Sequence, residues 1–251
     1  LADLTAPALG AHPLAATLQR SSFAGGEVDE VIMGNVVAAG LRQAPARQAL
    51  RQAGLPDACP ATTLNKVCGS GMKAAMVATD LIRAGSARVV LAGGMESMSN
   101  APYLIAKARS GLRMGHGELK DTLFLDGLED AATGRAMGTF AQSTADDYQL
   151  TRAAMDAWAT QSVERARAAI ASGALRAEIA PIEVGGSLVT DDEQPGRSRL
   201  ERIPTLRPAF KPDGTITAAN SSSISDGASA LLICGQDALG DREPLARIAG
   251  H

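Results

Sequence analysis

Aromatic residues are scarce in this sequence of 251 residues, since Phe, Trp and Tyr together make up 3% of it. There is also no run of about twenty apolar residues, the length that a transmembrane helix requires. Basic residues are not in excess, because 24 Lys and Arg stand against 27 Asp and Glu, for a formal net charge of −3. Nucleic-acid faces and basic membrane patches depend on such an excess, so we expect neither partner.

Cysteine and histidine are also few. The cysteines are Cys59, Cys68 and Cys234, and the histidines are His12, His116 and His251. An odd number of cysteines in a long chain argues against a disulfide framework and favours a reducing compartment, so we predict a cytoplasmic location. The spacings match no zinc-binding pattern, and we expect no metal site.

Hydrophobic residues, by contrast, make up 45% of the chain and charged residues 20%, which is typical of a globular protein. The length suits one large domain, or one domain with an insertion. Alanine and glycine are abundant, which predicts a core in which small side chains pack closely, as in buried α/β layers.

The N-terminal part of the chain alternates between helical and extended patterns. We predict helices over residues 4–22, 45–53 and 69–84, and strands over residues 28–37, 61–67 and 88–92. The helix over 69–84 is apolar almost all round, which predicts burial on most sides. Strand, helix and strand in this order predict a parallel α/β sheet.

The pattern changes over residues 95–215, where Gly, Pro and charged residues are frequent and long strands are missing. We interpret this region as an inserted loop domain. One clear helix is predicted over residues 151–172, with Thr151 as its N-cap and Gly173 after its end. Residues 185–208 are predicted to be a loop, and strands are predicted at residues 216–218, 228–234 and 245–248.

Cys68 follows a predicted strand and precedes a predicted helix, in the segment Asn65-Lys66-Val67-Cys68-Gly69-Ser70-Gly71-Met72. The nearby glycines allow a sharp turn and the close approach of a substrate. The start of a helix offers free N–H groups and a partial positive charge, which favour a thiolate and can hold an oxyanion formed from a thioester carbonyl. These features indicate a nucleophile, while a small buried structural cysteine remains the alternative on this reasoning alone.

Residues 65–75 resemble the acylation-site signature of the thiolases. Further segments resemble other blocks of that family in the same order: residues 34–37, 43–48, 91–99, 206–210, 214–220 and 225–228. The block at residues 91–99 reads Leu-Ala-Gly-Gly-Met-Glu-Ser-Met-Ser. Together they cover essentially the whole chain, which resembles the N-terminal two-thirds of a thiolase.

The resemblance implies an α/β fold with a thiolase-like layered core, arranged α-β-α-β-α in the complete protein. This chain would supply the N-terminal half, with the loop domain inserted at about residues 95–215. We expect a thiolase N-terminal domain over residues 1–237 and the start of a truncated C-terminal domain at residues 244–251. The Gly-His-Pro, Cys-x-Gly and Asn-Glu-Ala-Phe motifs of the family do not occur here. We therefore expect that the chain is part of a longer protein and lacks the acid and base residues needed for turnover.

The resemblance also implies an acyltransferase of fatty acid metabolism, of the acetyl-CoA acetyltransferase type. Cys68 would carry the acyl group during thiolytic cleavage of a 3-ketoacyl-CoA, or during the reverse condensation of two acetyl-CoA. Coenzyme A would be a co-substrate, and no cofactor would be bound permanently. The partners would be acyl-CoA substrates and further copies of the chain, in a homodimer or homotetramer.

By position, the resemblance assigns five residues to the coenzyme A and acyl tunnel: Met137, Phe210, Ala218, Ser222 and Ile224. The arginines at 197, 199 and 202 are a second candidate contact for the coenzyme A phosphates, with a solvated loop as the alternative. Two other functions stay open, namely a ketosynthase-like condensing enzyme and a catalytically inactive thiolase-like binding protein.

Overall fold

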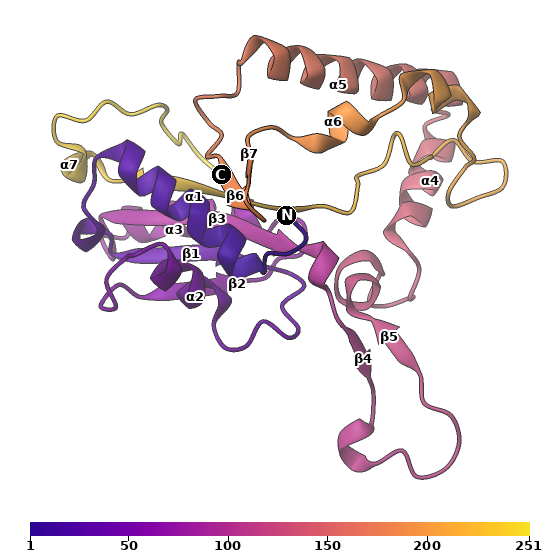
Figure 1. Ribbon diagram of the computed structural model, residues 1–251, viewed down its shortest axis with the longest axis horizontal. Helices are drawn as coiled ribbons and strands as arrows, with labels where there is room; N and C mark the ends of the chain where they lie inside the picture. The colour runs from indigo at the N-terminus through magenta and orange to yellow at the C-terminus, as the bar shows by residue number, and fades with distance from the viewer. The chain divides into compact units, whose positions relative to one another are not determined.

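The computed structural model describes all 251 residues. The chain forms two compact units, the first made of Leu1–Gly127 and Ser225–His251 and the second of Leu128–Ile224 (Figure 1). None of the helices combines the length and the apolar character that a membrane crossing requires.

A four-stranded sheet in the order β2-β1-β3-β8 forms the centre of the first unit. Its strands are β1 (Glu30–Gly34), β2 (Ala61–Leu64), β3 (Val89–Ser97) and β8 (Asp226–Cys234). β1 pairs in parallel with both β2 and β3, which confirms the predicted parallel α/β arrangement. β8 pairs antiparallel with β3 along its full length, so one antiparallel edge strand completes the sheet.

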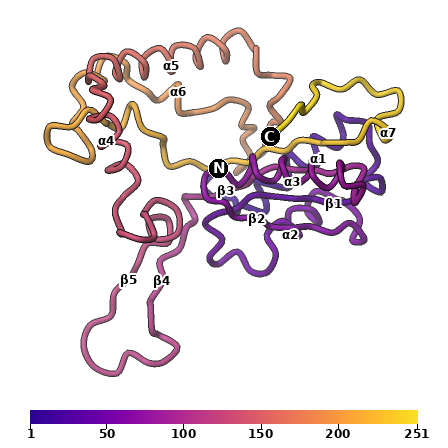
Figure 2. The backbone as a smooth tube through the Cα atoms, turned by 180° about the vertical axis from the view of Figure 1, so that it is seen from behind, coloured from indigo at the N-terminus to yellow at the C-terminus, as the bar shows by residue number.

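Three helices cover the two faces of this sheet (Figures 1 and 2). They are α1 (Ala6–Ser21), α2 (Pro45–Gln52) and α3 (Ser70–Arg83), close to their predicted bounds. Side chains alternate between the faces of a strand. Val31 and Met33 of β1 therefore pack in the cluster that includes residues of α1 and α2, while Ile32 packs with Ala74 and Ala78 of α3.

The remaining elements of the first unit are short. They are β4 (Tyr103–Ile105), β5 (Leu119–Asp121), α7 (Gln236–Leu239), the 3-10 turns Gly25–Glu27, Met98–Asn100 and Ala108–Ser110, and a π-helical turn at Phe124–Leu128 that runs to the boundary of the second unit. β4 and β5 form an antiparallel hairpin.

α3 is less buried than the sequence predicts. Ser70, Ala74 and Ala78 are buried, but Met72 near its start is 75% exposed. The prediction of burial on most sides is therefore wrong for this chain, because only the side of α3 that faces the sheet is covered.

Two strand predictions near the sheet are also corrected. β3 does not stop at residue 92 but continues to Ser97, because β8 pairs with it as far as Asp226. Residues 245–248 form no strand.

The second unit contains α4 (Met137–Asp147), α5 (Arg152–Ser172), α6 (Glu193–Arg197), the 3-10 segment Leu200–Thr205, and the hairpin of β6 (Ile182–Val184) and β7 (Ser187–Val189). α5 confirms its prediction, with Thr151 Oγ1 accepting from the N–H of Ala154 at 3.2 Å and Gly173 in the left-handed conformation. α4 was not predicted. The loop predicted over residues 185–208 is wrong in part, since it contains β7, α6 and the 3-10 segment.

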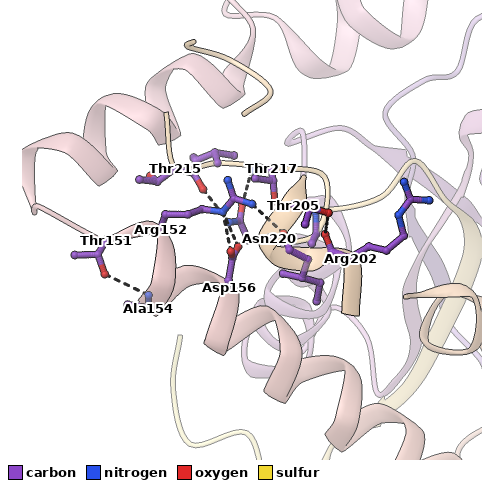
Figure 3. A network of polar contacts seen from close by, with 12 residues as sticks. Thr151, Arg152, Ala154, Asp156, Arg202, Thr205, Thr215, Thr217 and Asn220 are labelled. Carbon is purple, nitrogen blue, oxygen red and sulfur yellow. Dashed lines mark hydrogen bonds and ion pairs between the residues drawn. The ribbon is translucent and has the colours of Figure 1, made fainter. Parts of the chain in front are cut away.

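Side chains, not strand pairing, hold residues 214–220 in the second unit (Figure 3). Oε1 of Gln142, which is 3% exposed, accepts from the N–H groups of Thr215 at 3.0 Å and Ile216 at 3.1 Å. Oδ1 of Asn220 accepts from the N–H of Thr217 at 2.8 Å, and its Nδ2 donates to the Thr215 carbonyl at 3.0 Å. The strand predicted at residues 216–218 does not form, because these bonds already satisfy the backbone.

Gly34, at the end of β1, lies directly against the first turn of α3. A Cβ atom at this position would lie 2.6 Å from Ser70 Cβ, 2.7 Å from the Ser70 carbonyl carbon and 2.8 Å from the Gly71 nitrogen. Real Cβ contacts are essentially never this short. The absence of a side chain at residue 34 therefore sets how closely α3 approaches the sheet.

We predict that Gly34→Ala lowers the free energy of unfolding by about 1–3 kcal/mol, because α3 must move away from β1. Gly26→Ala is the matched control, since a Cβ atom there meets nothing within 4 Å, and we expect a change within about 0.5 kcal/mol. Urea unfolding monitored by circular dichroism measures both. Equal losses for the two variants would contradict the close approach.

Candidate functional site

The three parallel strands end at one edge of the sheet, and polar segments follow each of them. Asn65 and the Cys68 turn follow β2, Asn35 follows β1, and Glu96 is the second-last residue of β3. Ligands of open parallel sheets bind outside the carboxyl ends of the strands. This edge is therefore the candidate active site of the first unit.

Hydrogen bonds of Ser70 and Asn65 fix the turn that carries Cys68. Ser70 Oγ accepts from the Lys66 N–H at 2.8 Å and donates to the Val67 carbonyl at 2.6 Å. Asn65 Oδ1 accepts from the Val67 N–H at 2.9 Å. Cys68 itself is exposed, so the turn holds its thiol in contact with solvent.

Val67, immediately before Cys68, has a φ of +48°. This left-handed conformation is strained for a β-branched residue and costs on the order of 1–3 kcal/mol. The bonds of Asn65 and Ser70 to its N–H and carbonyl groups offset that strain. Such strain is concentrated at functional sites, where the surrounding structure enforces one geometry.

The first turn of α3 supplies hydrogen-bond donors next to Cys68. Gly69 is the N-cap and provides no side-chain bond. The N–H groups of Gly71 and Met72 donate to no backbone carbonyl. Unpaired N–H groups at a helix start favour a negative charge, so this turn can stabilise a thiolate or an oxyanion.

The other two cysteines have different surroundings. Cys59 is 5% exposed, and burial raises the pKa of its thiol although the nearby Arg47 opposes this. Burial also raises the pKa of the half-buried Cys234 thiol. Only Cys68 among the three cysteines is exposed.

The partly buried Glu96 and the buried Asn35 form a polar pair at the same edge. Glu96 accepts three hydrogen bonds, from Asn35 Nδ2 at 2.7 Å, the Val36 N–H at 2.8 Å and the Val37 N–H at 3.2 Å. Burial raises the pKa of the Glu96 carboxyl, and these three bonds oppose the rise. Neither this pair nor Ser70 is among the residues predicted from the sequence, although an acidic residue at the end of an apolar strand is a usable signal.

The five residues assigned to the tunnel all lie in the second unit, whereas Cys68 lies in the first. All five are exposed: Met137, Phe210, Ala218, Ser222 and Ile224. Met137 is the first residue of α4, and the ring of Phe210 lies against Gly138 beside it, since a Cβ atom at 138 would be 2.1 Å from Phe210 Cζ. Ala218 lies in the segment ordered by Asn220.

The arginines at 197, 199 and 202 are also exposed, but Arg197 is the last residue of α6 and Arg202 lies in the 3-10 segment, so they do not form the predicted loop. Arg197 pairs with Glu193 at 2.9 Å within α6. No three or more His, Cys, Asp or Glu side chains lie together in a way that could hold a metal ion.

Comparison with known proteins gives a consistent result. The family model described as "Thiolase, N-terminal domain" matches residues 1–237. An acetyl-CoA acetyltransferase of Pseudomonas aeruginosa is 48% identical over 100% of this chain and 66% of its own length. The corresponding Escherichia coli protein is 47% identical over the same shares, and that of Schizosaccharomyces pombe is 44% identical over 99% of this chain and 65% of its own length.

A solved structure agrees with these relatives. The Acat5 thiolase from Ascaris suum, in complex with coenzyme A, superposes with a TM-score of 0.93 at 39% identity. The match covers 97% of this chain and 64% of that one. The chain thus spans just under two thirds of the length of the proteins it matches.

The different surroundings of the three cysteines predict an order of alkylation. We expect iodoacetamide to modify Cys68 first, Cys234 more slowly and Cys59 last, because burial restricts access and raises the pKa of the latter two thiols. Peptide mass spectrometry of the native protein over time measures the order, and the urea-unfolded protein is the control. Modification of Cys59 as fast as Cys68 in the native protein would contradict the structure.

Proposed function

The chain belongs to the thiolase family, and from this premise we propose that the complete protein containing it is an acyl-CoA C-acetyltransferase. It cleaves a 3-ketoacyl-CoA with coenzyme A, or condenses two acetyl-CoA in reverse. The observation that carries this proposal is the exposed Cys68 thiol, on a strained turn beside unpaired N–H groups of α3. The names of the relatives support the same activity.

In the proposed cleavage, the Cys68 thiolate attacks the 3-keto carbon of the substrate. The bond between carbons 2 and 3 then breaks, and its electron pair goes to carbon 2, which takes a proton and leaves as acetyl-CoA. The shortened acyl group stays on Cys68 as a thioester. Coenzyme A loses its thiol proton, attacks this thioester and releases the Cys68 thiolate. N–H groups near Cys68 stabilise the oxyanion in the acyl-transfer step.

Proton transfer in both steps requires an acid and a base. The Gly-His-Pro and Cys-x-Gly motifs that the family uses do not occur in these 251 residues. We propose that another part of the complete protein supplies them. We also propose that residues 1–237 are the N-terminal domain, with an insertion at about residues 95–215. Residues 244–251 would then be the start of a C-terminal domain.

We propose that Met137, Phe210, Ala218, Ser222 and Ile224 contact coenzyme A and the acyl chain. Their exposure and the coenzyme A complex of the similar Ascaris suum thiolase support this assignment. Coenzyme A is then a co-substrate, with no cofactor bound permanently.

A homodimer or homotetramer is proposed for the complete protein. The β4–β5 hairpin supports an assembly, because it exposes Tyr103 by 64%, Met114 by 100% and Leu119 by 67%. A cytoplasmic location is proposed as well, supported by three cysteines that form no disulfide.

We predict that Cys68→Ala abolishes acyl-enzyme formation in the complete protein, because Cys68 is the exposed thiol on the turn at the start of α3 and the buried Cys59 and half-buried Cys234 cannot take its place. Radiolabelled acetyl-CoA followed by acid quenching measures the covalent label. Cys234→Ala is the control and should keep the wild-type label. Labelling of Cys68→Ala at the wild-type level would refute the proposed function, whereas coenzyme A binding without any labelling of the wild type would favour an inactive binding protein.

A second prediction concerns Phe210. Gly138→Ala forces the Phe210 ring to move, since the new Cβ would lie 2.1–2.4 Å from three ring atoms. We expect the KM for acyl-CoA to rise by about tenfold. Tenfold corresponds to about 1.4 kcal/mol, near the low end of the free-energy cost of overpacking a side chain. Gly196→Ala in α6 is the matched control, because nothing lies within 4 Å of a Cβ there. An unchanged KM in Gly138→Ala, measured in steady-state assays of the complete protein, would remove Phe210 from the binding site.

A further inference from the structure

The Glu96–Asn35 pair has two unfavourable features at one place. The Glu96 carboxyl is partly buried, which raises its pKa. Asn35 is 2% exposed, and its Oδ1 is buried without any hydrogen-bond partner. Leaving a buried acceptor unsatisfied is energetically unfavourable, because its desolvation is not compensated. Native structures contain few such groups, and they are concentrated where function requires them.

The neighbours of Asn35 explain why its Oδ1 is left without a partner. Its Nδ2 donates to the Met95 carbonyl at 3.1 Å and to Glu96 Oε1 at 2.7 Å. Turning the amide over would place Oδ1 against two acceptors, so the Nδ2 orientation is required. The amide is therefore oriented by Glu96 and Met95, and Oδ1 remains unpaired as the consequence.

A continuous series of contacts links this pair to the Cys68 turn. Glu96 holds the backbone of Val36 and Val37, and the Asn35 N–H donates to the Leu64 carbonyl at 3.0 Å, at the end of β2. The preceding residue, Gly34, lies against Ser70. Ser70 in turn bonds to the residues on both sides of the turn, Lys66 and Val67.

We propose that Glu96, acting through Asn35 and the end of β1, is a positioning residue for the Cys68 nucleophile. The proposal rests on the proposed function, in which Cys68 takes the acyl group. Glu96 fixes the end of β1, against which the start of α3 and the Cys68 turn are held. Its effect is on the orientation of the thiol and not on the contacts with coenzyme A.

Asp29 provides a matched comparison at the opposite end of the sheet. Its Oδ2 accepts from the N–H groups of Arg88 at 2.6 Å and Val89 at 2.9 Å, where β3 begins. Like Glu96, it is a carboxylate that holds backbone N–H groups of the same sheet. Unlike Glu96, it lies at the amino end of the parallel strands, away from the Cys68 turn.

The test compares Glu96→Gln with Asp29→Asn in the complete protein. The two Glu96 oxygens together accept three N–H groups, so the NH2 group of Gln faces a donor in either orientation. We expect kcat and the rate of acyl-enzyme formation to fall about 10- to 100-fold, because even a small displacement of the reacting thiol causes a rate loss of this size. The KM for acetyl-CoA should stay near the wild-type value. Asp29→Asn should keep the wild-type kcat.

Unfolding midpoints are measured for both variants, and the assays are run well below them. Equal kcat values for Glu96→Gln and Asp29→Asn, or a loss confined to KM, would overturn the proposal. If Glu96→Gln does not fold, the same assay is made with Asn35→Ser. This variant removes the amide that links Glu96 to Asn35 but leaves the bonds of Glu96 to the backbone of Val36 and Val37 in place. A wild-type kcat of Asn35→Ser would also overturn the proposal.

Cys68→Ala is assayed in parallel to separate this proposal from the proposed function. If Cys68→Ala still forms the acyl-enzyme, the proposed function fails. If Cys68→Ala forms none, the result for Glu96 concerns the positioning of Cys68 alone.

Discussion

The contact between Gly34 and the first turn of α3 is the constraint on which the rest of the first unit depends. Because residue 34 has no side chain, the backbone at Ser70 and Gly71 lies directly on the end of β1. This contact brings Ser70 into position to bond to Lys66 and Val67, so that the chain turns tightly between β2 and α3. Cys68 is at the outer side of that turn and is exposed.

Energetically unfavourable features gather around this contact. Val67 adopts a left-handed backbone, Glu96 is a partly buried carboxyl with a raised pKa, and Asn35 keeps an unpaired buried oxygen. Cys59, by comparison, is a buried cysteine in an apolar cluster and shows no such strain. A stable fold does not need these features, and their grouping at one sheet edge is what a preorganised nucleophile requires.

The sequence predicted the elements whose signals are local. Thr151 and Gly173 mark the ends of α5 by capping, and the apolar strands β1 and β3 are evident from composition. The end of β3 was misplaced because it depends on pairing with β8, far along the chain. The strand expected at residues 216–218 is absent because Gln142, from α4, takes the backbone N–H groups. Cys68 was indicated by its flanking glycines and the helix start, and the resemblance of residues 65–75 to the thiolase signature assigned it as the nucleophile. Glu96 has a weak local signal, as an acidic residue at the end of an apolar strand, but its bond to Asn35 joins residues about sixty positions apart and has no local pattern.

In the proposed reaction, this turn presents Cys68 to a thioester carbonyl. The most direct measurement is peptide mass spectrometry of the complete wild-type protein, quenched in acid shortly after mixing with acetyl-CoA. We expect one acetyl group on the peptide that contains Cys68, and its disappearance when coenzyme A is added before the quench. An acetyl group found only on another residue, or one on Cys68 that coenzyme A does not remove, would contradict it.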